Sequence, residues 1–230
     1  MPDMRFAVNG VIIAAKVEGN PCSNGPYVVL LHGFPDSSRL WKAQVPVLVQ
    51  QGFRVVAPDL RGFGESSRPA DIQAFSLRNA QADVLAVLDA LGIDSFYLVG
   101  HDWGSALAWR MAATVPNRVH RLVAISVGHP GGMWGVGGAE QRAASWYFLL
   151  FQYQGKAEQL LQADGWKLFR EFMGPHVGSE DMAAYIRDLS RPGALSAGLS
   201  WYRANFQVER FAATEPAFDM PKFLPLPMKL

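Results

Sequence analysis

The sequence predicts an α/β protein with a doubly wound, mostly parallel sheet that carries helices on both faces. Short apolar segments, which are typical of buried strands, alternate with amphipathic helical segments over residues 1–130. From residue 139 onward the segments are helix-like only and rich in aromatic residues. We therefore expect a core at 1–130 and a helical cap at 131–215, with a connector at 216–230 that leads back towards the core.

Strands and helices alternate along the whole predicted core. The predicted strands cover residues 12–17, 27–31, 53–57, 96–99 and 119–126. The predicted helices cover residues 41–51, 76–91 and 105–115. The clearest helix is 76–91, because Ser76 can cap its start, its apolar residues recur on one face and Gly92 can end it. Right-handed crossovers between successive strands then make the sheet parallel.

Composition changes at both ends of the predicted cap. Five glycines lie between residues 131 and 138, which predicts a flexible junction with the core. Pro221, Pro225 and Pro227 lie in the last fifteen residues, which predicts an extended tail. The cap is thus expected to be an insertion over the carboxyl ends of the strands.

Charge and cysteine content exclude several classes of protein. Lys plus Arg is 21 and Asp plus Glu is 20, so a nucleic-acid partner is not expected. Cys22 is the sole cysteine, and an intramolecular disulfide is therefore impossible. The first residues lack the pattern of a signal peptide, and the apolar runs are too short for a membrane span. We expect a cytoplasmic protein, with its oligomeric state left open.

The segment Gly100-His-Asp102-Trp-Gly104 has the spacing of a nucleophile elbow, with a predicted strand before it and a predicted helix after it. The central residue is Asp where many hydrolases have Ser. A carboxylate is already ionised at neutral pH and needs no base to attack carbon. Asp102 is therefore the predicted nucleophile, and the alternative is a structural Asp at a strand end.

Two further motifs follow predicted strands. In His32-Gly-Phe34-Pro35, the backbone N–H of Phe34 is expected to form an oxyanion hole with the N–H of Trp103. His32 is expected to pack and shape this loop. The segment from Asp59 to Ser66 contains two glycines, and its Asp and Arg are expected to tie loops together.

With these motifs the chain resembles the soluble epoxide hydrolases and the haloalkane dehalogenases of the α/β-hydrolase superfamily. The segment 146–155 resembles the one that bears the first lid tyrosine of the epoxide hydrolases, and 199–205 the one that bears the second. The resemblance implies catalytic roles for Asp102, Tyr147 and Tyr202. It further implies hydrolysis of a small apolar epoxide to a vicinal diol through a covalent ester on Asp102, with no metal and no organic cofactor.

The chemistry explains why two tyrosines are needed. Attack of a carboxylate on an epoxide generates an alkoxide, a strong base that a phenol can hydrogen-bond and protonate. A haloalkane dehalogenase is the first alternative, but such enzymes commonly have Asn where this chain has Phe34. A non-catalytic binding protein is the second. Tyr97, Tyr153 and Tyr185 are expected only to pack.

The resembling families hydrolyse the ester with water activated by a His, which a second carboxylate orients. Both groups follow later strands, and this sequence ends at Leu230 before either is due. We therefore expect a chain that lacks the last strand or strands and the terminal helix, and whose turnover is impaired. Of the remaining histidines, only His129 is expected to be able to face the pocket.

Overall fold

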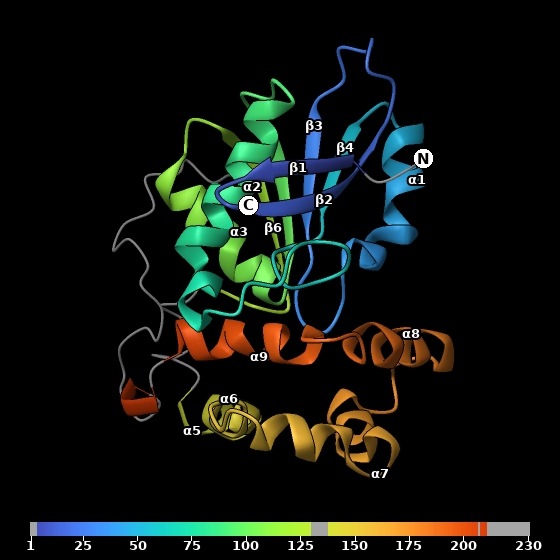
Figure 1. The fold of residues 1–230 in the computed structure, drawn as a ribbon. Coiled ribbons are helices and arrows are strands. Elements are labelled where there is room, and N and C mark those ends of the chain that lie inside the picture. The colour runs from blue at the N-terminus through green and yellow to red at the C-terminus, as the bar shows by residue number, and fades with distance from the viewer. Residues whose placement is uncertain (1–3, 130–137, 207, 211–230) are drawn as a thin grey trace.

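The computed structural model describes residues 4–129, 138–206 and 208–210, which form an α/β core with a layer of helices against one end of it (Figure 1). The strands of the core are β1 (Met4–Val8), β2 (Val11–Glu18), β3 (Tyr27–Leu31), β4 (Arg54–Pro58), β5 (Phe96–His101) and β6 (Val119–Ile125). They form one sheet in the order β1-β2-β4-β3-β5-β6. The pairs β3–β4, β3–β5 and β5–β6 are parallel, whereas β1–β2 and β2–β4 are antiparallel.

Helices cover both faces of the sheet, as predicted. Those of the core are η1 (Ser38–Lys42), α1 (Gln44–Gln50), η2 (Ile72–Phe75), α2 (Leu77–Ala90) and α3 (Trp103–Thr114). In Figure 1, α1 lies on one face, and α2 and α3 lie on the other. Alternate residues of β3 point to opposite faces of the sheet. Val28 and Leu30 pack in the cluster beside α1, and Val29 and Leu31 pack in the main core with α2 and α3.

Most predicted boundaries agree with the structure to within two residues. Ser76 caps α2 by accepting the N–H of Asn79 at 3.3 Å. The predicted helix 41–51 is divided, because Trp41 belongs to η1 and α1 begins only at Gln44. Strand β1 was not predicted, and it adds an antiparallel hairpin to the expected parallel sheet. The turn of this hairpin is Asn9-Gly10, with φ of 48° and 77°.

The second part of the chain is entirely helical where the structure describes it. We call its five helices the helical layer: α5 (Gly138–Ala144), α6 (Trp146–Phe151), α7 (Lys156–Met173), α8 (Ser179–Leu189) and α9 (Ala194–Asn205), followed by η3 (Val208–Arg210). Figure 1 shows α8 and α9 next to the core, with α5, α6 and α7 beyond them. Most of the predicted glycine junction and the whole of the predicted connector at 216–230 lie outside the described residues.

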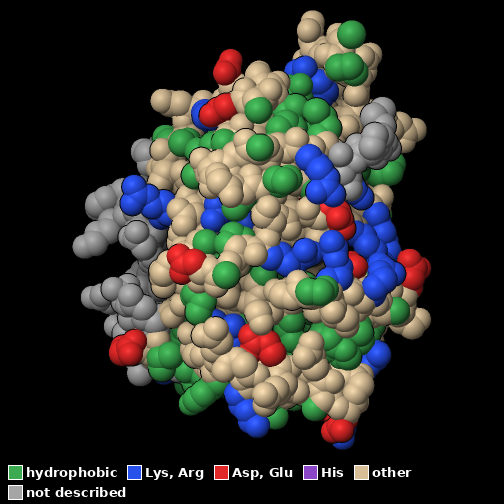
Figure 2. Space-filling view, viewed as in Figure 1, with side chains coloured by type: hydrophobic (Ala, Val, Ile, Leu, Met, Phe, Trp, Pro, Cys, Tyr) green, Lys and Arg blue, Asp and Glu red, His purple; other side chains and the backbone are tan. Residues whose placement is uncertain are grey.

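Contacts along α9 attach the helical layer to the core. The indole N–H of Trp201 donates to the carbonyl oxygen of Arg61 at 3.0 Å, and the side chain of Asn205 accepts the N–H of Leu77 at 2.8 Å. At the other end of the layer, Arg39 donates to Asp181 at 2.6 Å. Basic, acidic and apolar side chains are interspersed on the face that Figure 2 shows. Within the described residues, no helix combines the length and the apolar character that a membrane span requires.

Candidate active site

Asp102 lies in the sharp turn between β5 and α3, with φ 53° and ψ −122°. A residue with a side chain rarely adopts this conformation, which costs roughly 1–3 kcal/mol. The turn is tight enough to exclude side chains on both flanking glycines. A Cβ on Gly100 would lie 2.2 Å from the carbonyl oxygen of Gly104, and a Cβ on Gly104 would lie 2.2 Å from that of Leu31. Glycine is therefore required at both positions.

The carboxylate of Asp102 is held by two backbone N–H groups. The N–H of Phe34 donates to Oδ1 at 2.8 Å, and the N–H of Trp103 also hydrogen-bonds the carboxylate. A Cβ on Gly33 would lie 2.2 Å from the same Oδ1, so only glycine fits there. The two donors expected to form an oxyanion hole therefore already bind the carboxylate of the predicted nucleophile.

Opposing effects act on the ionisation of Asp102. Burial raises the pKa of its carboxyl above the ordinary value, because a buried charge loses its hydration. The N–H groups of Trp103 and Phe34 and the charge of His101 oppose that rise in pKa. The backbone donors thus favour the ionised form that a nucleophile requires.

His32 supports the loop that carries Phe34. Its Nε2 accepts the N–H of Leu60 at 2.9 Å, and this fixes the tautomer, so that Nδ1 donates to the carbonyl oxygen of Gly33 at 3.0 Å. Burial lowers the pKa of this imidazole, which keeps it neutral. Its ring lies edge-on to Phe63 at 5.1 Å between centroids. The expectation that His32 shapes the loop is confirmed.

The turn after β4 has the expected role of tying loops together. The carboxylate of Asp59 accepts the N–H of Ser38 at 2.8 Å and that of Glu65 at 2.9 Å. Arg61 forms a buried ion pair with Asp83 at 2.6 Å. The hydrogen-bonding groups of Asp59 and Arg61 are thus occupied by contacts within the protein, so neither side chain is free to act on a substrate.

The two predicted lid tyrosines come together above the elbow. Tyr147 lies on α6 and Tyr202 on α9, with ring centroids 5.8 Å apart. The ring of Tyr202 lies 5.1 Å from that of Trp103 and 5.8 Å from that of Phe34. Thus segments more than 160 residues apart in sequence meet, and all five predicted site residues lie in one cluster.

Burial and the charge of Asp102 both raise the pKa of the phenols of Tyr147 and Tyr202. The phenol of Tyr147 adds to the rise at Tyr202, which a side-chain hydrogen bond with Trp103 opposes. Because the shift favours the neutral form, both hydroxyls are proton donors at neutral pH. The site therefore combines a carboxylate with two acids at close range.

Aromatic side chains enclose this cluster. Phe148 and Phe151 of α6 lie 5.0 and 4.9 Å from the ring of Tyr202, and Phe172 of α7 lies 4.8 Å from that of Tyr147. Apolar and aromatic surroundings of this kind are typical of sites that bind small apolar molecules. Sequence reasoning missed these phenylalanines as part of the site, although the aromatic content of the segment 146–153 indicated Phe148 and Phe151.

Three other tyrosines were expected only to pack, and the structure bears this out for one of them. Tyr185 does more than pack, because its hydroxyl donates to Asp36 at 3.0 Å. Tyr153 is 67% exposed, so the expectation that it packs inside the cap was wrong. Tyr97 does pack, between Phe53 and His120. The long sequence separation between Tyr185 and Asp36 hid their contact.

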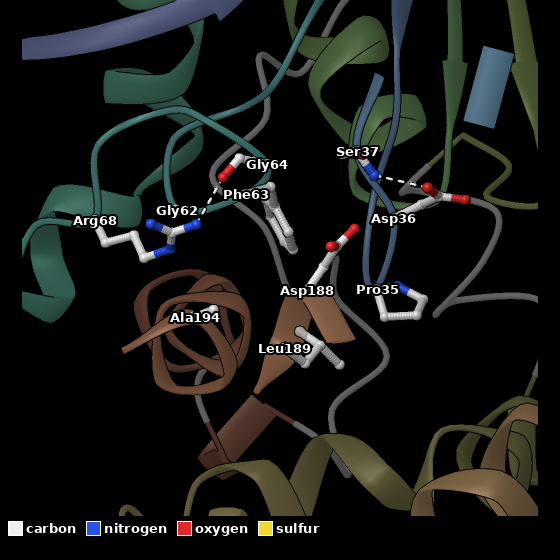
Figure 3. Close-up of a pocket in the computed structure, with 10 residues that line it drawn as sticks. All are labelled: Pro35, Asp36, Ser37, Gly62, Phe63, Gly64, Arg68, Asp188, Leu189 and Ala194. Atoms are coloured by element: carbon white, nitrogen blue, oxygen red, sulfur yellow. Dashed lines mark hydrogen bonds between the residues drawn. The ribbon is translucent and has the colours of Figure 1, made fainter. Parts of the chain in front are cut away.

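A small cavity lies at the junction of the core and the helical layer (Figure 3). Its volume of about 10 Å³ is room for a single water molecule. Its polar wall includes Asp36, which accepts the N–H of Ser37, and Arg68, which donates to the carbonyl oxygen of Gly64. The cavity is too small for an organic substrate. Among the described residues, no group of three or more His, Cys, Asp or Glu side chains could hold a metal ion.

Comparison with known proteins agrees with this geometry. Residues 26–169 match the family model described as the alpha/beta hydrolase fold. An AB hydrolase superfamily protein of Bacillus subtilis, YfhM, is 34% identical over 203 residues, which are 85% of this chain and 70% of that protein. This chain therefore belongs to the alpha/beta hydrolase family.

Proteins named as epoxide hydrolases are among its relatives. Epoxide hydrolase B of Mycobacterium tuberculosis is 41% identical over 145 residues, covering 61% of this chain and 41% of that protein. The chain thus spans less than half the length of this relative. An epoxide hydrolase of Bacillus megaterium, solved as a mutant in complex with its diol product, superposes with a TM-score of 0.82 at 28% identity. That match covers 96% of this chain and 79% of the other.

Proposed function

We propose that this protein opens epoxides through a covalent ester on Asp102. The observation that carries the proposal is the meeting of the half-buried carboxylate of Asp102 with the half-buried phenol of Tyr147 and the buried phenol of Tyr202, whose raised pKa values keep both phenols protonated. Neither partner alone would indicate this reaction. Together they supply a nucleophile for the ring carbon and an acid for the ring oxygen.

The proposed step has a defined balance of bonds and protons. The other carboxylate oxygen of Asp102, Oδ2, attacks a ring carbon, a C–O ester bond forms and the C–O bond of the epoxide breaks. Oδ1, held by the N–H of Phe34 at 2.8 Å, becomes the ester carbonyl oxygen. The alkoxide takes a proton from Tyr147 or Tyr202, while the other phenol hydrogen-bonds it. The helical layer acts as a cap that supplies these two acids.

The names of the relatives support the same substrate class. The M. tuberculosis relative is an epoxide hydrolase by name, and the B. megaterium structure holds a naphthyloxy-propanediol as its product. The aromatic enclosure around Tyr202 fits a small apolar epoxide. The haloalkane dehalogenase alternative has less support, because the side chain of Phe34 offers no donor to a halide and packs against Phe151 and Tyr202.

Hydrolysis of the ester needs a base, and three described histidines are placed elsewhere. His32 bonds Leu60 and Gly33, His120 packs against Tyr97, and His129 lies edge-on to Trp109. His129, the candidate from sequence, thus packs two helical turns beyond the elbow. We propose that in the 230-residue chain ring opening is faster than hydrolysis, so that the ester accumulates.

Intact-protein mass spectrometry after incubation with a small aryl epoxide tests this proposal. The expected product is a protein heavier by one intact epoxide, with the label mapped to Asp102 and absent from Asp102→Asn. A label on another residue would overturn the assignment of the nucleophile. Steady formation of diol without an adduct would overturn the accumulation of the ester.

A further inference from the structure

A buried ion pair inside the helical layer lies directly beside Tyr202. The side chain of Arg203 is 5% exposed, and that of Glu158 is 12% exposed. The guanidinium donates to both carboxylate oxygens, at 2.9 Å to Oε1 and 3.1 Å to Oε2. Such a planar, two-pronged contact fixes orientation as well as distance.

Each member of the pair also bonds a second element. Nε of Arg203 donates to the carbonyl oxygen of Phe151 at 2.8 Å, where α6 ends. Glu158 accepts the N–H of Gly155 at 2.8 Å at the start of α7, and the hydroxyl of Ser196 on α9 at 2.9 Å. One ion pair therefore joins α6, α7 and α9.

Two of the three joined helices, α6 and α9, carry the two proposed acids. Tyr147 lies one turn before Phe151 on α6, and Tyr202 immediately precedes Arg203 on α9. The two rings meet at 5.8 Å between centroids. Because α9 is held to the core through Trp201, any contact that fixes α6 against α9 also fixes Tyr147 relative to the elbow.

We propose that Arg203 is a positioning residue for ring opening, which together with Glu158 sets the separation of the phenols of Tyr147 and Tyr202. This inference rests on the proposed function. Burial alone would raise the pKa of Glu158, but hydrogen bonds from Arg203, the backbone and Ser196 bring that pKa below its ordinary value. The carboxylate of Glu158 thus stays ionised and accepts both hydrogen bonds from Arg203.

Buried ion pairs often add little to stability, because desolvation cancels much of the attraction. Their better-attested role is to select one arrangement of packed elements. The alternative for this pair is a purely structural role, in which its loss would weaken the fold without a specific effect on the acids. The two roles predict different results for substrates that differ in their need for a proton.

Arg203→Lys keeps the charge and the apolar stem but loses the two-pronged contact. We expect it to slow adduct formation with an aryl epoxide by about 10–100-fold, the effect of a misplacement of about 1 Å. Adduct formation with an alkyl halide, whose leaving group needs no proton, should change by less than about 3-fold on the same reasoning. In a Tyr147→Phe background, Arg203→Lys should add little, because the phenol whose position it fixes is already gone.

Arg118→Lys is the matched control. Arg118 also bonds a carboxylate, that of Asp89, and two carbonyl oxygens, those of Ile93 and Asp94, but it lies in the core. We expect this variant to react like the wild type with both substrates. Equal slowing of the epoxide and the halide by Arg203→Lys, or full additivity with Tyr147→Phe, would overturn the positioning role.

A second measurement needs no substrate and separates this inference from the proposed function. In protein with isotope-labelled tyrosine, the nuclear Overhauser effect between the rings of Tyr147 and Tyr202 reports their contact. We expect it in the wild type and in Arg118→Lys, and expect it to be weaker in Arg203→Lys and Glu158→Gln. An unchanged intensity in both variants would overturn the inference. A wild type that shows the effect but never forms an adduct would overturn only the proposed function.

Discussion

The two halves of the candidate site are built in different ways. The core half holds Asp102 with backbone N–H groups, a strained turn and glycines that no larger residue could replace. The half in the helical layer holds Tyr147 and Tyr202 with aromatic packing and one buried ion pair. The proposed nucleophile is thus fixed by the main chain, whereas the proposed acids depend on side chains that join three helices. A substitution in the core half should therefore abolish adduct formation, whereas a substitution in the other half should only slow it.

The largest effect is expected for a substitution in the core half of the site. Asp102→Gly removes the nucleophile and should abolish adduct formation with an epoxide. Because glycine tolerates φ 53°, the same change should also relieve the strain of the turn and stabilise the fold by roughly 1–3 kcal/mol. Chemical denaturation followed by circular dichroism would measure this gain.

Asp102→Asn is the matched control for that gain. It also lacks the nucleophile, but it keeps a side chain at the strained position. It should therefore be inactive without becoming as stable as Asp102→Gly. A lower stability for the glycine variant would mean that contacts of the carboxylate, rather than strain, dominate at this position.

A smaller effect is expected when the acids are removed. Tyr147→Phe and Tyr202→Phe should each slow ring opening by about 10²–10⁴-fold, the usual weight of general acid catalysis. An alkyl halide should lose far less, since its leaving group takes no proton. Rates of adduct formation on both substrates, compared in the same variants, measure the difference. Equal losses on both would show that the tyrosines only support the structure.

How far the sequence could predict each half follows from the range of the contacts. The elbow depends on residues within a few positions of Asp102, so its spacing was visible in the sequence. Tyr147 and Tyr202 were found only through resemblance to a family, because no local pattern distinguishes them from packing tyrosines. Arg203 and Glu158 are 45 positions apart, and the sequence alone does not show which of its charged residues form an ion pair at such a separation.

Some local signals were nevertheless overlooked. Asn9-Gly10 between two apolar runs is a strong hairpin signal, and it predicts β1, which our sequence analysis did not. A similar signal interrupts α7, where Asp164-Gly165 adopt left-handed conformations in the middle of a helix. Tertiary packing was not needed to find either feature. The contact of Tyr185 with Asp36, 149 positions away, did need the fold.

The smallest expected effect concerns alkaline pH and sharpens the description of the acids. An ordinary phenol with a pKa near about 10 is half ionised at pH 10 and can then no longer donate its proton fully. Burial and the charge of Asp102 raise the pKa of both Tyr147 and Tyr202, so both remain protonated as the pH rises through 10. The rate of adduct formation should therefore stay level, within about 2-fold, up to pH 10.

At the acid end, the raised pKa of Asp102 places the loss of the ionised nucleophile above pH 3.8. A stopped-flow pH profile of adduct formation measures both limits. A decline centred below pH 10 would mean that one of the phenols ionises readily, and the enclosure of the two acids would then be more open than their burial implies.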